Sequence, residues 1–181
     1  MTSTSRRVAV VAYPLLTDES RQWIESVRYS HDPQAARIRA HFTLVFPCAV
    51  EWESVAAEAD SAAASFTPFD FRIVDVSGVP DRVGSGAHVF LVPDGQARQQ
   101  LAGLHDRLYA RGLRTLLAHD IPYVPHITIA GHVDLTWCQA LADKIAETGK
   151  TVQGRVEAIE LIDVGSTPVK TLRVSALSGT G

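Results

Sequence analysis

The sequence has few cysteines and no long apolar run. Its two cysteines, Cys48 and Cys138, lie far apart without C-x-x-C spacing, which excludes a disulfide framework and a zinc ribbon. No apolar stretch approaches the roughly 20 residues that span a bilayer, and the start of the chain lacks the pattern of a cleavable signal peptide. We therefore expect a cytoplasmic protein without a membrane segment, in which both thiols are free.

The sequence also lacks a large excess of positive or negative charge. The chain has 17 Lys and Arg against 20 Asp and Glu, a net charge of −3. Proteins that coat long duplex nucleic acid by counterion release need a basic surface, so that class is excluded, whereas a nucleotide or an RNA terminus remains a candidate partner. With 181 residues, 46% of them apolar, the chain has the composition of one globular domain. We expect a monomer.

The order of the predicted elements is similar in the two halves of the chain, 1–83 and 84–181. In the first half, hydrophobic periodicity predicts strands at 8–13, 41–47 and 69–76, a helix capped by Thr17 or Asp18, a short helix after Asp32-Pro33 and a helix at 51–64. In the second half it predicts strands at 87–93, 126–130, 152–164 and 169–177 and helices at 96–111 and 134–147. The glycine-rich segment 77–86 is expected to be the loop between the halves.

One motif occurs once in each half: a histidine, an apolar residue, a threonine and an apolar residue. The two copies are His41-Phe42-Thr43-Leu44 and His126-Ile127-Thr128-Ile129, 85 residues apart, the offset that also relates Trp52 to Trp137. Roughly 0.1 such motif is expected by chance in a chain of this composition. The repeat predicts one bilobed domain with a pseudo-twofold axis, in which the two motif strands face each other across a groove.

The residue types of this motif are suited to acid–base chemistry on a phosphodiester. Alternation along a strand places His41 and Thr43 on one face, about 6.6 Å apart, and does the same for His126 and Thr128. A neutral imidazole can take a proton from an attacking water while an imidazolium protonates the leaving oxygen. Threonine hydroxyls can hydrogen-bond the non-bridging phosphate oxygens. In this scheme the catalysis requires no metal ion and no other cofactor.

The paired motifs resemble those of the two-histidine (2H) phosphoesterase superfamily, which includes the 2′-5′ RNA ligase-like proteins and cyclic phosphodiesterases. The resemblance extends over nearly the whole chain and is carried by Asp32-Pro33, the segment 40–47 and the segment 123–130. It implies an α+β, bilobed fold with two antiparallel sheets around a central cleft and helices on the outer faces. It also implies metal-independent action on 2′,3′-cyclic or 2′-5′-linked phosphodiesters, with catalysis by His41 and His126 and phosphate contacts from Thr43 and Thr128.

Several alternatives remain open at this point. Tyr123 could edge the cleft and stack on a base, or it could anchor a proline-rich turn. Arg39 could meet an anionic substrate from the strand that leads to His41, or it could be a solvated charge. The protein could also be a nucleotide- or RNA-end-binding module without turnover, a 2′-5′ RNA ligase, since ligation is the reverse of diester cleavage, or a metal-dependent hydrolase.

Overall fold

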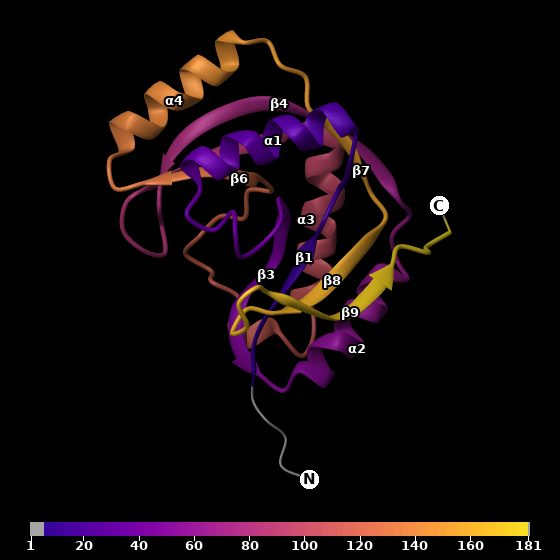
Figure 1. Ribbon diagram of the computed structural model, residues 1–181. Coiled ribbons are helices and arrows are strands. Elements are labelled where there is room, and N and C mark those ends of the chain that lie inside the picture. The colour runs from indigo at the N-terminus through magenta and orange to yellow at the C-terminus, as the bar shows by residue number, and fades with distance from the viewer. Residues whose placement is uncertain (1–5, 181) are drawn as a thin grey trace.

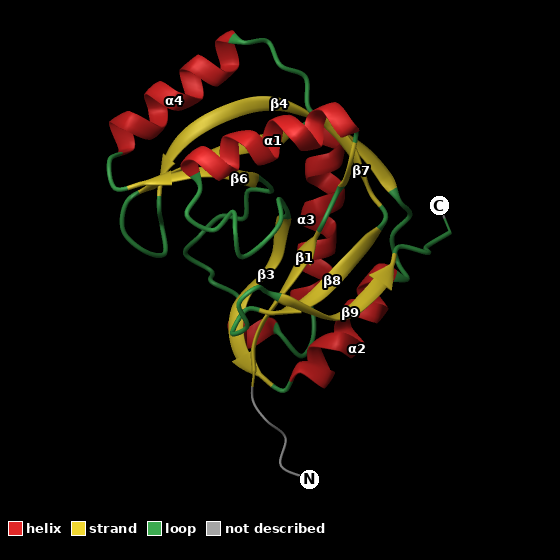
Figure 2. Cartoon of the chain, viewed as in Figure 1, coloured by secondary structure: helices red, strands yellow, loops and turns green. Residues whose placement is uncertain are grey.

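Helices and strands are interspersed along residues 6–180, the part of the chain that the computed structural model describes (Figures 1 and 2). The α-helices in this part are α1 (Asp18–His31), α2 (Trp52–Ala63), α3 (Gly95–Tyr109) and α4 (Leu135–Glu147), with one 3₁₀ turn at Arg114–Leu116. The strands are β1 (Arg6–Ala12), β2 (Leu15–Leu16), β3 (Phe42–Val50), β4 (Phe69–Pro80), β5 (Ala87–Pro93), β6 (Ile127–His132), β7 (Gln153–Val156), β8 (Ala158–Asp163) and β9 (Lys170–Ala176).

The strands form one curled antiparallel sheet in the order β2-β7-β4-β5-β6-β3-β1-β8-β9. The arrangement is nearly twofold about the contact of β3 with β6. Moving outward, β3 is followed by β1, β8 and β9, and β6 is followed by β5, β4 and β7. Because β3 and β6 pair at a single residue pair, the sheet divides there into two lobes. The expected α+β fold with two related antiparallel sheets is confirmed, with the two sheets continuous through this contact.

The two lobes do not coincide with the two halves of the sequence. Strand β4 belongs to the first half of the chain but pairs with β5 and β7 in the lobe of the second motif. Strands β8 and β9 come from the second half, and β8 pairs with β1 in the lobe of the first motif. Each lobe is therefore completed by strands from the other half of the chain.

The helices pack on the sheet and bury one face each. Helix α1 contacts β6, α4 contacts β4 and β5, α2 contacts β8 and β9, and α3 contacts β3 and β4. The predicted cap of α1 is confirmed, since the Thr17 side chain accepts a hydrogen bond from the Ser20 amide at 3.2 Å. Helix α4 ends before Gly149, which has a φ of +60° and so adopts the left-handed conformation that glycine favours.

The central strand β1 is buried on both faces. Val8 and Val10 belong to the main core under the helices, whereas Ala9 and Val11 form a second, smaller cluster on the opposite face. That second cluster is covered by side chains from two loops, among them Ile38 and Val164. These loops replace a helix as the cover of this face, and they bring polar side chains to it.

Four local predictions are wrong in detail. The expected loop at 77–86 is shorter, because β4 continues to Pro80. The segment after Asp32 is a turn rather than a short helix, because the Asp32 carboxylate accepts from the Gln34 amide and stabilises a turn instead. The expected strand at 152–164 is divided into β7 and β8, which belong to different lobes. In β3, Val45 is buried and Phe46 is exposed, because irregularities in the pairing with β1 shift the alternation.

Candidate active site

The two motif strands are direct neighbours in one sheet, so the prediction that they face each other across a groove is wrong. Phe42 of β3 pairs with Ile127 of β6, and these are the residues between histidine and threonine in the two motifs. Both side chains are fully buried in the core, so the flanking residues point to the other face of the sheet. Continuing the antiparallel register by one residue in each direction places His41 opposite Thr128, and Thr43 opposite His126. The single pair Phe42–Ile127 thus sets the two motifs side by side, and this cross-strand arrangement is the one its continuation would give.

Both imidazoles are oriented in the same way. His41 Nδ1 lies 2.7 Å from the Arg39 carbonyl oxygen, and His126 Nδ1 lies 2.6 Å from the Val124 carbonyl oxygen. A carbonyl oxygen only accepts hydrogen bonds, so Nδ1 carries the proton in each ring. The neutral rings therefore hold the free lone pair on Nε2. In each case the accepting carbonyl belongs to the residue two positions earlier, which repeats the twofold relation at the level of single hydrogen bonds.

Burial lowers the pKa of both histidines to about 4. The hydrogen bond to the backbone carbonyl raises each pKa in part, and the charge of Arg28 lowers that of His41 further. The charge of His41 also lowers the pKa of His126, as expected for two imidazoles in one site. Both rings are therefore neutral at pH 7 in the free protein, and an anion placed between them would raise their pKa values and favour protonation of one.

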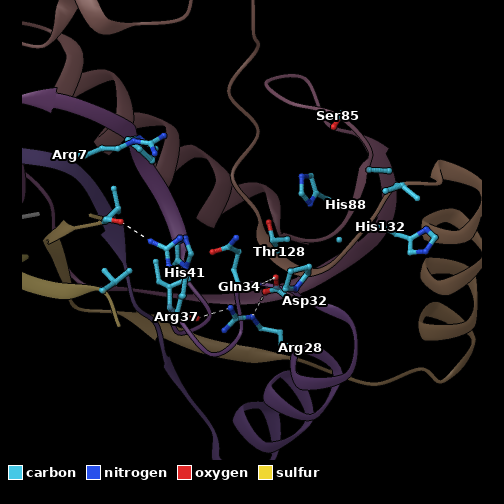
Figure 3. A pocket seen from close by; sticks show the side chains of 18 residues that line it. Arg7, Arg28, Asp32, Gln34, Arg37, His41, Ser85, His88, Thr128 and His132 are labelled. Atoms are coloured by element: carbon cyan, nitrogen blue, oxygen red, sulfur yellow. Dashed lines mark hydrogen bonds and ion pairs between the residues drawn. The ribbon is translucent and has the colours of Figure 1, made fainter. Parts of the chain in front are cut away.

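A cavity of about 730 Å³ opens beside this strand pair (Figure 3). His41 and Thr128 line it, whereas Thr43 and His126 are not among its lining residues. The His126 ring is stacked on Phe90 of β5, with the ring centroids 3.5 Å apart. The cavity is lined by Arg7, Arg28, Asp32, Pro33, Gln34, Arg37, Ile38, His41, Pro47, Ser85, Ala87, His88, Thr128, Gly131, His132, Val133, Val164 and Val169.

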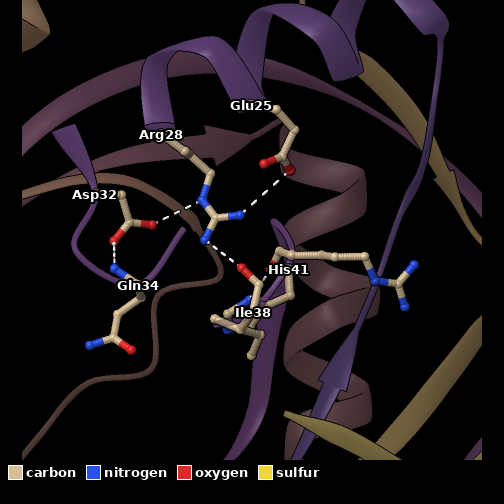
Figure 4. A network of polar contacts seen from close by, with 7 residues as sticks. Glu25, Arg28, Asp32, Gln34, Ile38 and His41 are labelled. Atoms are coloured by element: carbon tan, nitrogen blue, oxygen red, sulfur yellow. Dashed lines mark hydrogen bonds and ion pairs between the residues drawn. The ribbon is translucent and has the colours of Figure 1, made fainter. Parts of the chain in front are cut away.

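A buried ion pair supports the chain just before His41 (Figure 4). The Arg28 side chain is 1% exposed, and its Nε donates to Asp32 Oδ2 at 2.9 Å. Its Nη2 donates to the Ile38 carbonyl at 2.7 Å, which holds the turn that leads into β3. Sequence analysis missed this pair, although a basic and an acidic residue four positions apart at a helix end are a recognisable signal.

The two further cleft candidates from the sequence lie outside the cavity lining. The Tyr123 hydroxyl donates to the Thr43 carbonyl at 2.8 Å, and its ring is stacked on His105 with centroids 3.9 Å apart. Burial raises the pKa of Tyr123 well above its usual value. The Arg39 guanidinium lies 4.0 Å from the centre of the Tyr13 ring and is 70% exposed. Tyr123 therefore supports the strand that carries Thr43. Arg39 also lies 3.7 Å from Glu160, and the Tyr13 ring that it covers is 6.0 Å from the His41 ring.

Several other polar side chains of the cavity, among them two arginines and a histidine, were not singled out by the sequence. Arg7 and Arg37 line it, and so does His88, which lies 3.3 Å from Asp81 through Nε2. Nδ1 of His88 is buried and has no hydrogen-bond partner among the described residues. No local pattern marks these three residues, because they come from different strands and loops that only the fold brings together.

Neither a metal cluster nor a membrane helix is found in the described chain. No group of three His, Cys, Asp or Glu side chains within residues 6–180 is arranged to hold a metal ion. None of the helices in this range is long and apolar enough to cross a membrane.

Comparison with known proteins gives one family and a set of similar folds. The model of the 2′-5′ RNA ligase superfamily matches residues 16–167. No curated protein matches the chain. The structure of TT0787 of Thermus thermophilus is similar with 18% identity and a TM-score of 0.62, covering 97% of this chain and 100% of that one. E. coli LigT complexed with 3′-AMP has 18% identity and a TM-score of 0.60, with 96% and 99% covered. Usb1 of Kluyveromyces marxianus has 12% identity and a TM-score of 0.61, with 93% and 98% covered.

Proposed function

The chain belongs to the 2′-5′ RNA ligase superfamily, and we propose that it is a metal-independent phosphodiesterase acting on a 2′,3′-cyclic phosphate or on a 2′-5′-linked nucleotide or RNA end. The family that the motifs indicated is confirmed by this match, and the solved structures share the fold. The catalytic pair in this proposal is His41 and His126. Thr43 and Thr128 contact the phosphate.

The observation that carries the proposal is the pairing of β3 with β6. It sets the two motifs side by side in the sheet, which supports a site in which one phosphate contacts the histidines and threonines of both motifs. Both rings keep Nε2 free, because Nδ1 is bonded to the backbone. The structure of E. coli LigT with 3′-AMP fits a nucleotide substrate in proteins of this fold.

The proposed reaction with a 2′,3′-cyclic phosphate is an in-line displacement. The neutral imidazole of one histidine takes a proton from water through Nε2 as the water oxygen forms a bond to phosphorus. The bond from phosphorus to one ribose oxygen breaks, and the other histidine, protonated beforehand, gives its Nε2 proton to that oxygen. The threonine hydroxyls donate hydrogen bonds to the non-bridging oxygens, where negative charge increases in the transition state.

The near-symmetry of the two motifs leaves the roles of base and acid interchangeable. The bound phosphate anion raises the pKa of the adjacent imidazoles, which allows one of them to be protonated near neutral pH. Two such groups in opposite protonation states predict a bell-shaped dependence of kcat on pH. An activity that stays flat from pH 5 to 9 would contradict the mechanism.

The test is hydrolysis of a panel of 2′,3′-cyclic nucleotides and 2′-5′ dinucleotides in EDTA. We expect the wild type to turn over at least one of them, and His41→Ala and His126→Ala each to lose at least ~10²-fold in kcat. His119→Ala is the matched control, because His119 is an exposed histidine outside the cavity lining. It should keep wild-type activity.

The other outcomes assign the remaining functions. Tight nucleotide binding without turnover, surviving either His→Ala change, would favour a binding module. Activity that EDTA abolishes would favour a metal-dependent hydrolase. Joining of a 2′,3′-cyclic end to a 5′-hydroxyl, with the same dependence on both histidines, would add 2′-5′ ligation as the reverse reaction.

A further inference from the structure

The cavity has more positive charge than one phosphodiester requires. Three arginines, Arg7, Arg28 and Arg37, line it together with a single carboxylate, that of Asp32. Arg28 is already paired with this carboxylate at 2.9 Å. Neither Arg7 nor Arg37 forms an ion pair within residues 6–180. Two guanidinium groups without a carboxylate therefore share one end of the cavity, on the side of His41 (Figure 3).

Val164 hydrogen-bonds the side chain of Arg37 and the backbone of Arg7. Arg37 Nη2 donates to the Val164 carbonyl at 2.8 Å, and the Val164 amide donates to the Arg7 carbonyl at 2.9 Å. Arg37 Nε is buried and has no hydrogen-bond partner among the described residues. Because this Nε atom is shielded by protein atoms, a ligand in the cavity would meet the terminal nitrogens of the Arg37 guanidinium.

We propose that Arg7 and Arg37 bind a second phosphate of the substrate, the one attached to the 5′-oxygen of the nucleotide whose phosphodiester lies between the histidines. A guanidinium is suited to this role, because its planar fork of N–H donors matches phosphate oxygens. The cavity volume of about 730 Å³ is in the range of sites that enclose a small ligand. The apolar side chains of Ile38, Val164 and Val169 line the same cavity and offer a surface for the nucleoside.

The proposal deepens the proposed function, on which it rests, by selecting the substrate class. A nucleoside cyclic phosphate with a free 5′-hydroxyl leaves Arg7 and Arg37 unused. A nucleotide with a 5′-phosphate, or the last nucleotide of an RNA chain, supplies the second phosphate at this position. Both sources have the same chemistry and differ in whether this phosphate is a terminal monoester or an internucleotide diester.

The experiment measures binding by calorimetry, so it does not depend on turnover. The probes are nucleoside 2′- and 3′-monophosphates of the four bases, the same compounds with an added 5′-phosphate, and dinucleotides that end in a 2′- or 3′-phosphate. We expect the added phosphate to tighten binding to wild type by about 10-fold or more, the usual size of a charge-assisted hydrogen bond. Arg37→Gln and Arg7→Gln should each reduce this gain, and the double variant should remove it.

The matched control is Arg6→Gln, a change of the same charge on the same strand. Arg6 pairs with Asp163 and does not line the cavity, so this variant should keep the full gain. Equal binding of the compounds with and without the 5′-phosphate, a gain that survives the double variant, or no binding of any probe would overturn the proposal. A gain with the dinucleotide identifies an RNA end, and a gain only with the 5′-monophosphates identifies a mononucleotide.

The outcomes also separate this proposal from the proposed function. If the substrate panel shows no turnover but the 5′-phosphate gain depends on Arg7 and Arg37, the subsite stands and the enzymatic activity does not. If the panel shows turnover that depends on both histidines but the gain is missing, the phosphodiesterase stands and the second phosphate site does not.

Discussion

At the scale of single residues, the two motif histidines are prepared for proton transfer by the same two features. A carbonyl two residues earlier holds Nδ1, and burial lowers the pKa to about 4. The first feature fixes which nitrogen faces a substrate, and the second keeps the ring neutral until an anion binds. His41 and His126 therefore have to be considered as a pair whose titration changes when substrate is present.

The lowered pKa values predict that stability depends on pH between about 4 and 6.5. Unfolded histidine takes up a proton near pH 6.5, whereas native His41 and His126 remain neutral down to about pH 4. The free energy of unfolding is therefore highest above pH 6.5 and falls as the pH is lowered toward 4. In this pH window each histidine changes the free energy of unfolding by up to about 1.4 kcal/mol per pH unit.

Urea unfolding of wild type, His41→Gln and His126→Gln at a series of pH values checks this dependence. Each substitution should reduce the slope between pH 4 and 6.5, and the double variant should reduce it most. Above pH 7.5, where both histidines are neutral in both states, the pH dependence of the variants and of wild type should agree. Burial also lowers the pKa of His105, so wild type and all variants should retain some dependence of the free energy of unfolding on pH. An unchanged slope in the double variant would contradict the assigned pKa values.

At the scale of elements, the turn between α1 and β3 places His41, and the buried Arg28–Asp32 pair holds that turn. Arg28 comes from the last turn of α1, and Asp32 is the residue at its C-terminal cap. The guanidinium also bonds the Ile38 carbonyl near the end of the turn. Backbone hydrogen bonds such as that from the Ala35 amide to the Asp32 carbonyl at 3.0 Å form the turn, and the side-chain contacts of Arg28 tie it to α1.

Removal of Arg28 should therefore be costly. Arg28→Met leaves the Asp32 carboxylate, which is 5% exposed, without its ion-pair partner. We expect a loss of about 3–5 kcal/mol in the free energy of unfolding. Arg28→Met combined with Asp32→Asn should recover part of this loss, because it removes the unpaired buried charge. Urea denaturation of the single and double variants measures the coupling, and a double variant no more stable than Arg28→Met would argue against a buried pair.

At the scale of the whole molecule, the exchange of strands between the two halves of the chain ties the lobes together. Strand β4 completes the lobe of the second motif, and β8 and β9 complete the lobe of the first. Neither half of the chain contains all strands of one lobe. We therefore expect the two lobes to unfold as one cooperative unit.

The tryptophans offer one probe for each lobe. Trp52 begins α2, which packs on β8 and β9, and Trp137 lies in α4, which packs on β4 and β5. Two variants are made in a background with Trp23→Phe, one that keeps only Trp52 and one that keeps only Trp137. In each variant the unfolding transition measured by tryptophan fluorescence should coincide with the transition measured by circular dichroism. A fluorescence transition separated from the circular dichroism transition in either variant would mean that the lobes unfold independently.

Much of this protein was predictable from the sequence, because the signals concerned are local. The alternation of side chains in His41–Thr43 and in His126–Thr128 places each pair on one face of a strand. N-cap residues and glycines at the helix ends predict most helices. The offset of 85 residues between the motifs predicts the twofold relation, and the match to the superfamily confirms the family that the motifs indicated. The catalytic roles of the two histidines stay a prediction.

The tertiary structure alone decided which residues meet. The pairing of Phe42 with Ile127, which sets the two motifs side by side, depends on strand order in the sheet, and no local pattern encodes it. The same holds for Arg7 and Arg37, which reach one cavity from a strand and a turn. Side-chain period and capping act over a few residues, whereas the neighbours of a strand are chosen by burial and hydrogen bonding over the whole chain.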